Sequence, residues 1–208
     1  MAERQYETNV FVNCPLDAAY QPLRDAIVFA IHDCGFSARA ALEVSDASQV
    51  RIDKISTIIA DCKFGVHDIS RTEIDVVTTL PRFNMPLELG LFLGAKRFGT
   101  GEQKLKNCLI LDVERYRYQK FISDIAGQDI AAHGGIPETA IRAVRDWLSD
   151  SRESARKIPG GAAMVERYLT FRADLPGISA TKGLVATELT FNEYDFAIEE
   201  WLDHNRTA

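Results

Sequence analysis

Short apolar runs alternate with longer amphipathic segments through the first half of the chain. The runs are rich in β-forming residues and predict strands at residues 9–14, 36–41, 62–70 and 106–112. The segments between them carry apolar residues three or four positions apart and predict helices at residues 22–34, 48–60 and 84–99. Alternation of this kind indicates βαβ units, so we expect an α/β fold with a parallel sheet flanked by helices.

Helical spacing dominates beyond the fourth predicted strand. Helices are predicted at residues 116–125, 136–150, 162–171 and 190–204, with a loop or one weak strand at residues 127–135. Pro176 and Gly177 are typical of a turn, so residues 175–182 are expected to be irregular. We therefore predict an α/β domain over residues 1–125 and a helical C-terminal extension over residues 126–208 that packs on it.

Composition narrows the class of protein. The chain has 208 residues, 46% of them hydrophobic, and its net charge of −6 gives no reason to expect nucleic acid as the main partner. No stretch approaches the roughly 20 apolar residues of a membrane span, and the polar N-terminus does not resemble a signal peptide. The four cysteines match no zinc pattern, so we expect reduced, buried thiols and no metal site. A cytoplasmic protein without a membrane partner follows as the expectation.

Polar side chains lie where the predicted strands end. Asn13 and Asp17 follow the first strand, Asp68 lies at the end of the third, and Asp112 ends the fourth. Open parallel sheets bind ligands beyond the carboxyl ends of their strands, so these side chains are expected to meet at one cleft. Each type also has an ordinary structural explanation, as a helix cap for Asn13 and Asp17 and as a turn former for Asp68.

Residues 80–94 predict a turn that leads into an apolar helix. Asn84 is a candidate N-cap, and Pro86 then occupies the first turn, where its missing N–H costs little. The helix is apolar nearly all round, which predicts that it is buried. Glu88 is the one ionisable residue in its first two turns. Its carboxylate either interacts favourably with the helix dipole, worth up to ~1 kcal/mol, or is a catalytic group at the mouth of a cleft.

Other recognisable catalytic motifs are absent from the sequence. Residues 13–17 fit neither a P-loop nor a dinucleotide fingerprint, and the chain has no Gly-x-Ser-x-Gly nucleophile elbow. Cys14 as a nucleophile would need a histidine partner, and none of the four histidines stands in an obvious partner position. A carboxylate suits reactions in which positive charge develops on a sugar, and cleavage of an N-glycosidic bond is such a reaction.

The sequence PRFNMPLELGLFLG, residues 81–94, resembles the Pro-Arg-x-Asn-x-x-x-Glu-Leu-Gly-x-x-x-Gly stretch of bacterial Toll/interleukin-receptor-like (TIR-like) nucleotide-binding domains. The resemblance covers roughly residues 8–113 and implies a flavodoxin-like fold. It implies an enzyme that cleaves NAD as its substrate, with no bound cofactor and with Glu88 as the catalytic carboxylate. It also implies a homo-oligomer and a role as an effector in bacterial defence or signalling.

Five further side chains would then bind the nucleotide. These candidate substrate-binding residues are Asn13, Asp17, Asp68, Arg82 and Asn84. On this resemblance the first three would hold ribose hydroxyls or phosphate, and the last two would contact phosphate or ribose hydroxyls. A solvated loop charge is the alternative for Arg82, and a helix cap is the alternative for Asn84.

The same layout is similar to nucleoside 2-deoxyribosyltransferases, which use a glutamate in a Glu-Leu-Gly context as a nucleophile on the sugar. That family usually has an aspartate six residues before the glutamate, where this chain has Arg82. Two alternatives therefore stand beside the NAD-cleaving enzyme. One is a nucleoside or nucleotide deoxyribosyltransferase or N-glycosidase, and the other is a non-catalytic module that senses a nucleotide or serves as an adaptor.

Overall fold

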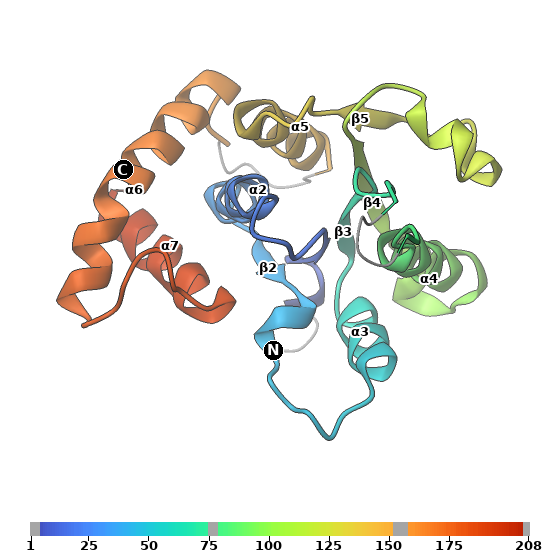
Figure 1. The fold of residues 1–208 in the computed structure, drawn as a ribbon, viewed down its shortest axis with the longest axis horizontal. Coiled ribbons are helices and arrows are strands. Elements are labelled where there is room, and N and C mark those ends of the chain that lie inside the picture. The colour runs from blue at the N-terminus through green and yellow to red at the C-terminus, as the bar shows by residue number, and fades with distance from the viewer. Residues whose placement is uncertain (1–4, 75–78, 152–157, 206–208) are drawn as a thin grey trace.

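A five-stranded parallel sheet forms the centre of the molecule in the computed structural model, which describes residues 5–74, 79–151 and 158–205 (Figure 1). The strands are β1 (Asn9–Asn13), β2 (Ser37–Arg39), β3 (Phe64–Asp68), β4 (Asn107–Asp112) and β5 (Ile130–Ala132). Their order is β2-β1-β3-β4-β5, and every neighbouring pair is parallel. The predicted α/β fold with a flavodoxin-like strand order is thus confirmed.

Helices cover both faces of the sheet (Figure 1). One face carries α3 (Arg51–Ala60) and α4 (Asn84–Phe98), and the other carries α2 (Gln21–Asp33) and α5 (Pro137–Asp150). A further layer outside α2 consists of α6 (Gly161–Thr181) and α7 (Phe191–Asn205). α2 is therefore enclosed on both sides, and every residue from Asp25 to His32 is buried. None of the described helices is both long and apolar enough to cross a membrane.

The strands send successive side chains to opposite faces of the sheet. Val10 of β1 packs in the core with α2 and the C-terminal helices, whereas Phe11 packs with α3 and with Phe92 of α4. Gly65 of β3 allows this close approach, because a Cβ atom there would lie 2.7 Å from His67 Nε2 and 2.9 Å from the Phe92 ring. α4, which carries Glu88, is thus held directly against the sheet.

The C-terminal residues contribute both to the sheet and to the outer layer. The helices predicted at residues 136–150 and 190–204 are present as α5 and α7, and the predicted apolar face of α7 is buried. β5 pairs with β4, so the residues after 125 also supply the last strand of the sheet. Strands on both sides of residue 125 thus belong to one sheet. The domain boundary at that residue stays a prediction.

One predicted turn is wrong, because α6 continues through Pro176. A proline in a helix interior costs about 3 kcal/mol, through its missing N–H and the clash of its ring. Phe171, Leu175 and Ser179 are buried on either side of it, and the Ser179 hydroxyl donates a 2.8 Å hydrogen bond to the Leu175 carbonyl. Burial of this face against α2 and α7 therefore outweighs the local preference for a turn.

The predictions for α4 are wrong in two respects. Glu88, Leu89 and Phe92 are buried, but 57% of Leu87 is exposed, because α4 lies on the sheet with one face only. The helix also begins at Asn84, with Phe83 at the N-cap position and no side-chain capping bond. The Asn84 side chain is exposed and does not cap the helix.

The chain after β4 forms two short 3₁₀ helices where the sequence predicts one helix. These are η3 (Arg117–Lys120) and η4 (Ser123–Ile125). Tyr116, directly before η3, has a left-handed φ of 64°, which a continuous right-handed helix excludes. Tyr118 of η3 is buried beside Ile110 of β4 and Leu89 of α4.

Candidate functional site

The carboxyl ends of β1 and β3 define the candidate site. β2 lies on one side of β1 and β3 on the other, and parallel sheets of this order bind ligands at that reversal of strand order. Asn13 ends β1, Asp68 ends β3, and Glu88 follows one helical turn after the start of α4. The structure therefore brings these three predicted residues to one edge of the sheet.

Glu88 is a buried carboxylate, with 5% of its surface exposed. Its Oε1 atom lies 3.9 Å from Arg51 Nη2, at the start of α3. Burial raises the pKa of Glu88 above its ordinary value, and the positive charge of Arg51 opposes that rise. A buried carboxylate with a raised pKa and a distant cationic partner has the character of many active-site groups.

The cavity beside Glu88 is small, about 10 Å³, which is room for about one water molecule. Its walls come from β1, the segments after β1 and β2, and the helices α2, α3, α4 and α7, including Arg24 of α2 and Phe191 of α7. Cys14 also lines it, but burial raises the pKa of the Cys14 thiol well above its ordinary value. Cys14 is therefore a neutral wall residue and not an activated thiolate.

Asn13 joins β1 to the start of α4. Its Nδ2 atom donates a 2.9 Å hydrogen bond to the Met85 carbonyl and lies 3.0 Å from His67 Nδ1, which accepts its second hydrogen. The Asn13 Oδ1 atom is buried without a hydrogen-bond partner. Because both amide hydrogens are used to fix α4 and His67, the geometry gives Asn13 a positioning role next to Glu88.

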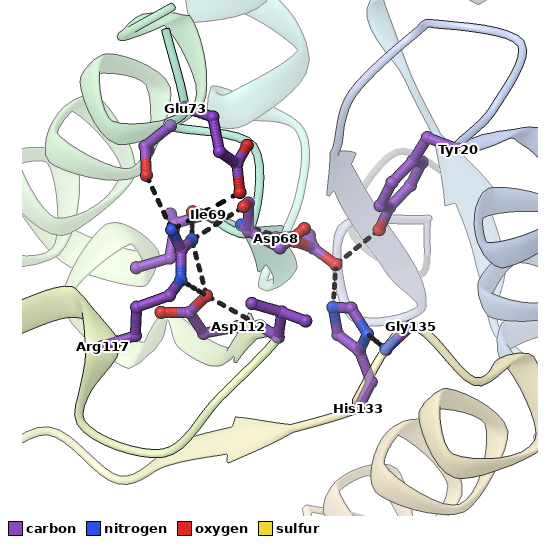
Figure 2. A network of polar contacts seen from close by, with 11 residues as sticks. Tyr20, Asp68, Ile69, Glu73, Asp112, Arg117, His133 and Gly135 are labelled. Atoms are coloured by element: carbon purple, nitrogen blue, oxygen red, sulfur yellow. Dashed lines mark hydrogen bonds and ion pairs between the residues drawn. The ribbon is translucent and has the colours of Figure 1, made fainter. Parts of the chain in front are cut away.

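A second polar network surrounds Asp68, at the end of β3 (Figure 2). The Tyr20 hydroxyl donates a 2.5 Å hydrogen bond to Asp68 Oδ2, and the Ser70 amide donates to Oδ1 at 2.8 Å. His133 Nε2 lies 3.0 Å from Oδ2, outside hydrogen-bond alignment. The Gly135 amide donates to His133 Nδ1 at 2.8 Å, so this ring carries its proton on Nε2 and is neutral. Asp68 is fully buried, and both its oxygens are already engaged by the protein.

Arg117 links the ends of β3 and β4 (Figure 2). It contacts Asp112 Oδ1 through Nε at 2.8 Å and donates to the carbonyls of Ile69 and Ser70 at 3.0 and 2.7 Å. Burial raises the pKa of Asp112, and the hydrogen bond from Arg117 opposes that rise. Arg117 thus binds Asp112 Oδ1 and two main-chain carbonyls at once and fixes the sheet edge, while Asp112 Oδ2 is buried without a hydrogen-bond partner.

The other predicted residues lie at the margin of the site. Asp17 Oδ1 accepts a 3.1 Å hydrogen bond from the Tyr20 amide and lies 3.5 Å from Arg71, so it organises the turn before α2. Arg82 and Asn84 are exposed at the start of α4, and neither lines the cavity of Glu88. The structure therefore does not bring these three residues to Glu88, and their nucleotide-binding roles stay predictions.

Several residues of the site are missed by reasoning from sequence. Tyr20 and His133 come from two separate loops, Arg117 begins η3, and Arg51 and Phe191 come from the starts of two helices. His133 directly follows β5, so its position at a strand end is the one signal that could have found it.

A scan against protein-family models, a search of curated proteins and a search of solved structures each found no match. The fold and site define an α/β protein with a buried carboxylate at the carboxyl edge of its sheet. Function is therefore inferred from the chemistry of that carboxylate and its surroundings.

Proposed function

We propose that this chain is a TIR-like enzyme that cleaves the N-glycosidic bond between nicotinamide and ribose in NAD, with Glu88 as the catalytic carboxylate. The burial of the Glu88 carboxylate at the carboxyl edge of the sheet, 3.9 Å from its cationic partner, carries the proposal. A carboxylate kept only to stabilise the fold would be expected to make closer hydrogen bonds, as Asp68 and Asp112 do.

The proposed reaction requires an ionised carboxylate beside the sugar. The bond between ribose C1′ and the nicotinamide nitrogen breaks, and its electron pair leaves with nicotinamide. Glu88 stabilises the positive charge that develops on C1′ or bonds to it, and water then supplies the oxygen that becomes the C1′ hydroxyl. Burial favours the neutral form of Glu88, and the charge of Arg51 favours the ionised form. Arg51 therefore serves as a positioning and charge-balancing residue.

Substrate binding requires the site to open. A cavity of about 10 Å³ is far below the ~300–1,000 Å³ of typical ligand sites. The segment around Ala41 and Leu42, the Arg51 side chain and Phe191 close it. Domains of the kind that this sequence resembles often act only when assembled, and a site that is closed in the single chain fits such behaviour.

The closed cavity also favours one alternative, a nucleotide-sensing or adaptor module without turnover. In that case the Glu88–Arg51 pair would be a structural contact and Glu88 would never meet a sugar. The deoxyribosyltransferase alternative stays a prediction, because this chain has Arg82 six residues before Glu88, where such enzymes usually have an aspartate.

The test is release of nicotinamide from NAD by the purified chain, measured by chromatography over a range of protein concentrations. Turnover that is lost in Glu88→Gln and kept in Glu166→Gln is the expected result. Glu166 is exposed on α6, so it provides the same chemical change away from the site. Full turnover by Glu88→Gln would contradict the assignment. Base exchange between deoxynucleosides would indicate the transferase, and stabilisation by NAD without turnover at any protein concentration would indicate the sensor.

A further inference from the structure

A second cavity, of about 210 Å³, lies between α2 and the C-terminal helices. Arg24 and Asp25 of α2, Arg172 of α6 and Tyr194 of α7 line it. The Tyr194 hydroxyl donates a 3.1 Å hydrogen bond to the Asp25 carbonyl, so α7 is bonded to α2 at the wall of this cavity. The cavity is thus built jointly by the α/β part of the chain and by the outer helical layer.

Two side chains separate this cavity from Glu88. Arg24 and Phe191 belong to the walls of both the 210 Å³ cavity and the small cavity beside Glu88. Burial raises the pKa of Cys14, in the wall of the small cavity, and the pKa of Asp25, in the wall of the 210 Å³ cavity. The positive charge of Arg24 opposes both rises. The two cavities are therefore direct neighbours, with the Phe191 ring and the Arg24 side chain between them.

The larger cavity has an excess of positive charge. Arg24 Nη2 lies 3.6 Å from Asp25 Oδ1, and Arg172 Nη1 lies 3.4 Å from Asp25 Oδ2. The Arg172 contact is a hydrogen bond, but both distances exceed the about 2.7–2.9 Å of close charge-assisted hydrogen bonds, and each guanidinium has further donors for another anion. Two guanidiniums face one carboxylate, and the donors of a guanidinium match the oxygens of a phosphate group.

We propose that the two cavities form one cleft when substrate is bound, in which Arg24 and Arg172 bind the phosphates of a nucleotide while its ribose C1′ lies at Glu88. This inference rests on the proposed function and names its substrate class, a phosphorylated nucleotide rather than a nucleoside. It makes α6 and α7 part of the substrate site, with Arg172 as a specificity-determining residue.

The start of α7 provides the means of joining the cavities. Asn192, next to Phe191, donates a 3.0 Å hydrogen bond to the carbonyl of Glu43 in η1 (Ala41–Glu43). η1 in turn supplies Ala41 and Leu42 to the wall of the Glu88 cavity. A displacement at the start of α7 therefore moves two of the walls that close Glu88, and it also frees the space of the Phe191 ring.

The experiment compares NAD with nicotinamide riboside, which has the same N-glycosidic bond but no phosphate. In Arg172→Met, KM for NAD should rise about 10- to 100-fold, as expected for loss of a charge-assisted phosphate contact, while cleavage of nicotinamide riboside is unchanged. Arg172→Lys should recover part of the NAD affinity, and Arg115→Met, a change at an exposed arginine after β4, should alter neither substrate. Unfolding midpoints of all variants show whether each has folded.

Failure of this inference is distinct from failure of the proposed function. Equal effects of Arg172→Met on NAD and on nicotinamide riboside, or no effect on either, would overturn the phosphate site while turnover by the unmodified chain stands. Should the chain show no turnover, calorimetric binding of NAD decides: binding that weakens in Arg172→Met supports the phosphate site without the enzyme. No binding of NAD to the unmodified chain overturns the phosphate site.

Discussion

The Asn13 amide donates a 2.9 Å hydrogen bond to the main-chain carbonyl of Met85, in the turn of α4 that directly precedes Glu88. The same amide group holds His67, which packs edge-on against Phe92 from the next turn of α4. One short side chain at the end of β1 therefore sets both the position of the start of α4 and the surface on which α4 rests. The placement of Glu88 depends on this contact.

Replacing Asn13 with alanine should lower both stability and activity. Two hydrogen bonds are lost, and the buried His67 Nδ1 loses its donor, which costs about 1–3 kcal/mol. The Met85 carbonyl loses the side-chain contact that ties the start of α4 to β1. The free energy of unfolding, from urea titration, should fall by a similar amount, and nicotinamide release should fall because α4 is no longer fixed.

Asn9→Ala is the matched control for Asn13. Asn9 begins the same strand, is also buried, and donates a 3.0 Å hydrogen bond to the Asp61 carbonyl at the opposite edge of the sheet. We expect Asn9→Ala to lower stability but not to change kcat. Equal loss of kcat in both variants would indicate a general loss of structure and would remove the special role of Asn13.

Glu88→Gln should stabilise the fold while it removes activity. The folded-state pKa of Glu88 is raised, so its stabilising contribution is present below the unfolded-state pKa and is lost as pH rises through the folded-state value. At neutral pH the ionised carboxylate therefore destabilises the native state. Each kcal/mol relieved raises Tm by about 2–4 °C in a chain of this size. A scan at pH 7.5 against Glu166→Gln measures this, and a fall in Tm would mean that Glu88 is a structural residue.

His67 should make the fold sensitive to acid. Complete burial lowers the pKa of His67 to about 3, and the nearby charge of Lys106 adds to this. In the unfolded chain the pKa is about 6.5, so unfolded molecules bind a proton that native ones do not. The contribution of His67 therefore falls by about 1.4 kcal/mol per pH unit as pH drops from about 6.5 toward 3.

Urea titrations of the unmodified chain and of His67→Gln at pH 7.5, 5.5 and 4.5 isolate this effect. Glutamine keeps an oxygen that can accept from Asn13 but does not titrate. The stability of the unmodified chain relative to the variant should fall with pH below 6.5. A difference that stays constant across the three values would show that His67 does not titrate differently in the two states.

Phe191→Ala should open the cavity beside Glu88 before substrate binds. Removing the ring joins the 10 Å³ and 210 Å³ cavities and relieves the need to displace Phe191 on binding. We expect faster association of NAD, measured by stopped-flow, with some loss of stability because Phe191 packs against the core. An unchanged association rate in a folded variant would show that Phe191 does not gate the site. Phe196→Ala, at an exposed position on the same helix, is the control.

The sheet could be predicted from sequence because β1 and β4 each contain a run of consecutive apolar residues, at 10–12 and 108–111. β1 and β3 are buried at every position. Buried strands that alternate with amphipathic helices are typical of a parallel sheet covered on both faces. The same logic placed Asn13 and Glu88 at one edge. α6 could not be predicted over its full length, since Pro176 is a local signal for a turn and only the burial of Phe171 and Leu175 overrides it.

The surroundings of Glu88 could not be predicted for a related reason. Helical spacing shows which face of α7 is buried but not what lies against it, so no pattern links Phe191 to Glu88. Tyr20 and His133 likewise meet at Asp68 only because two loops converge on the end of β3. Contacts between loops depend on the whole fold, so they cannot be predicted from the sequence around each residue.

The enclosure of α2 by α6 and α7 affects how the chain folds during synthesis. α2 is translated together with β1, and the helices that cover its outer side, α6 and α7, are translated after it. Until α6 and α7 emerge, Phe29 lacks the aromatic rings of Phe171 and Trp201 that pack against it. Nascent chains that end before α7 therefore present an apolar helix to chaperones and to each other, and truncation within α7 should yield aggregates rather than a smaller soluble domain.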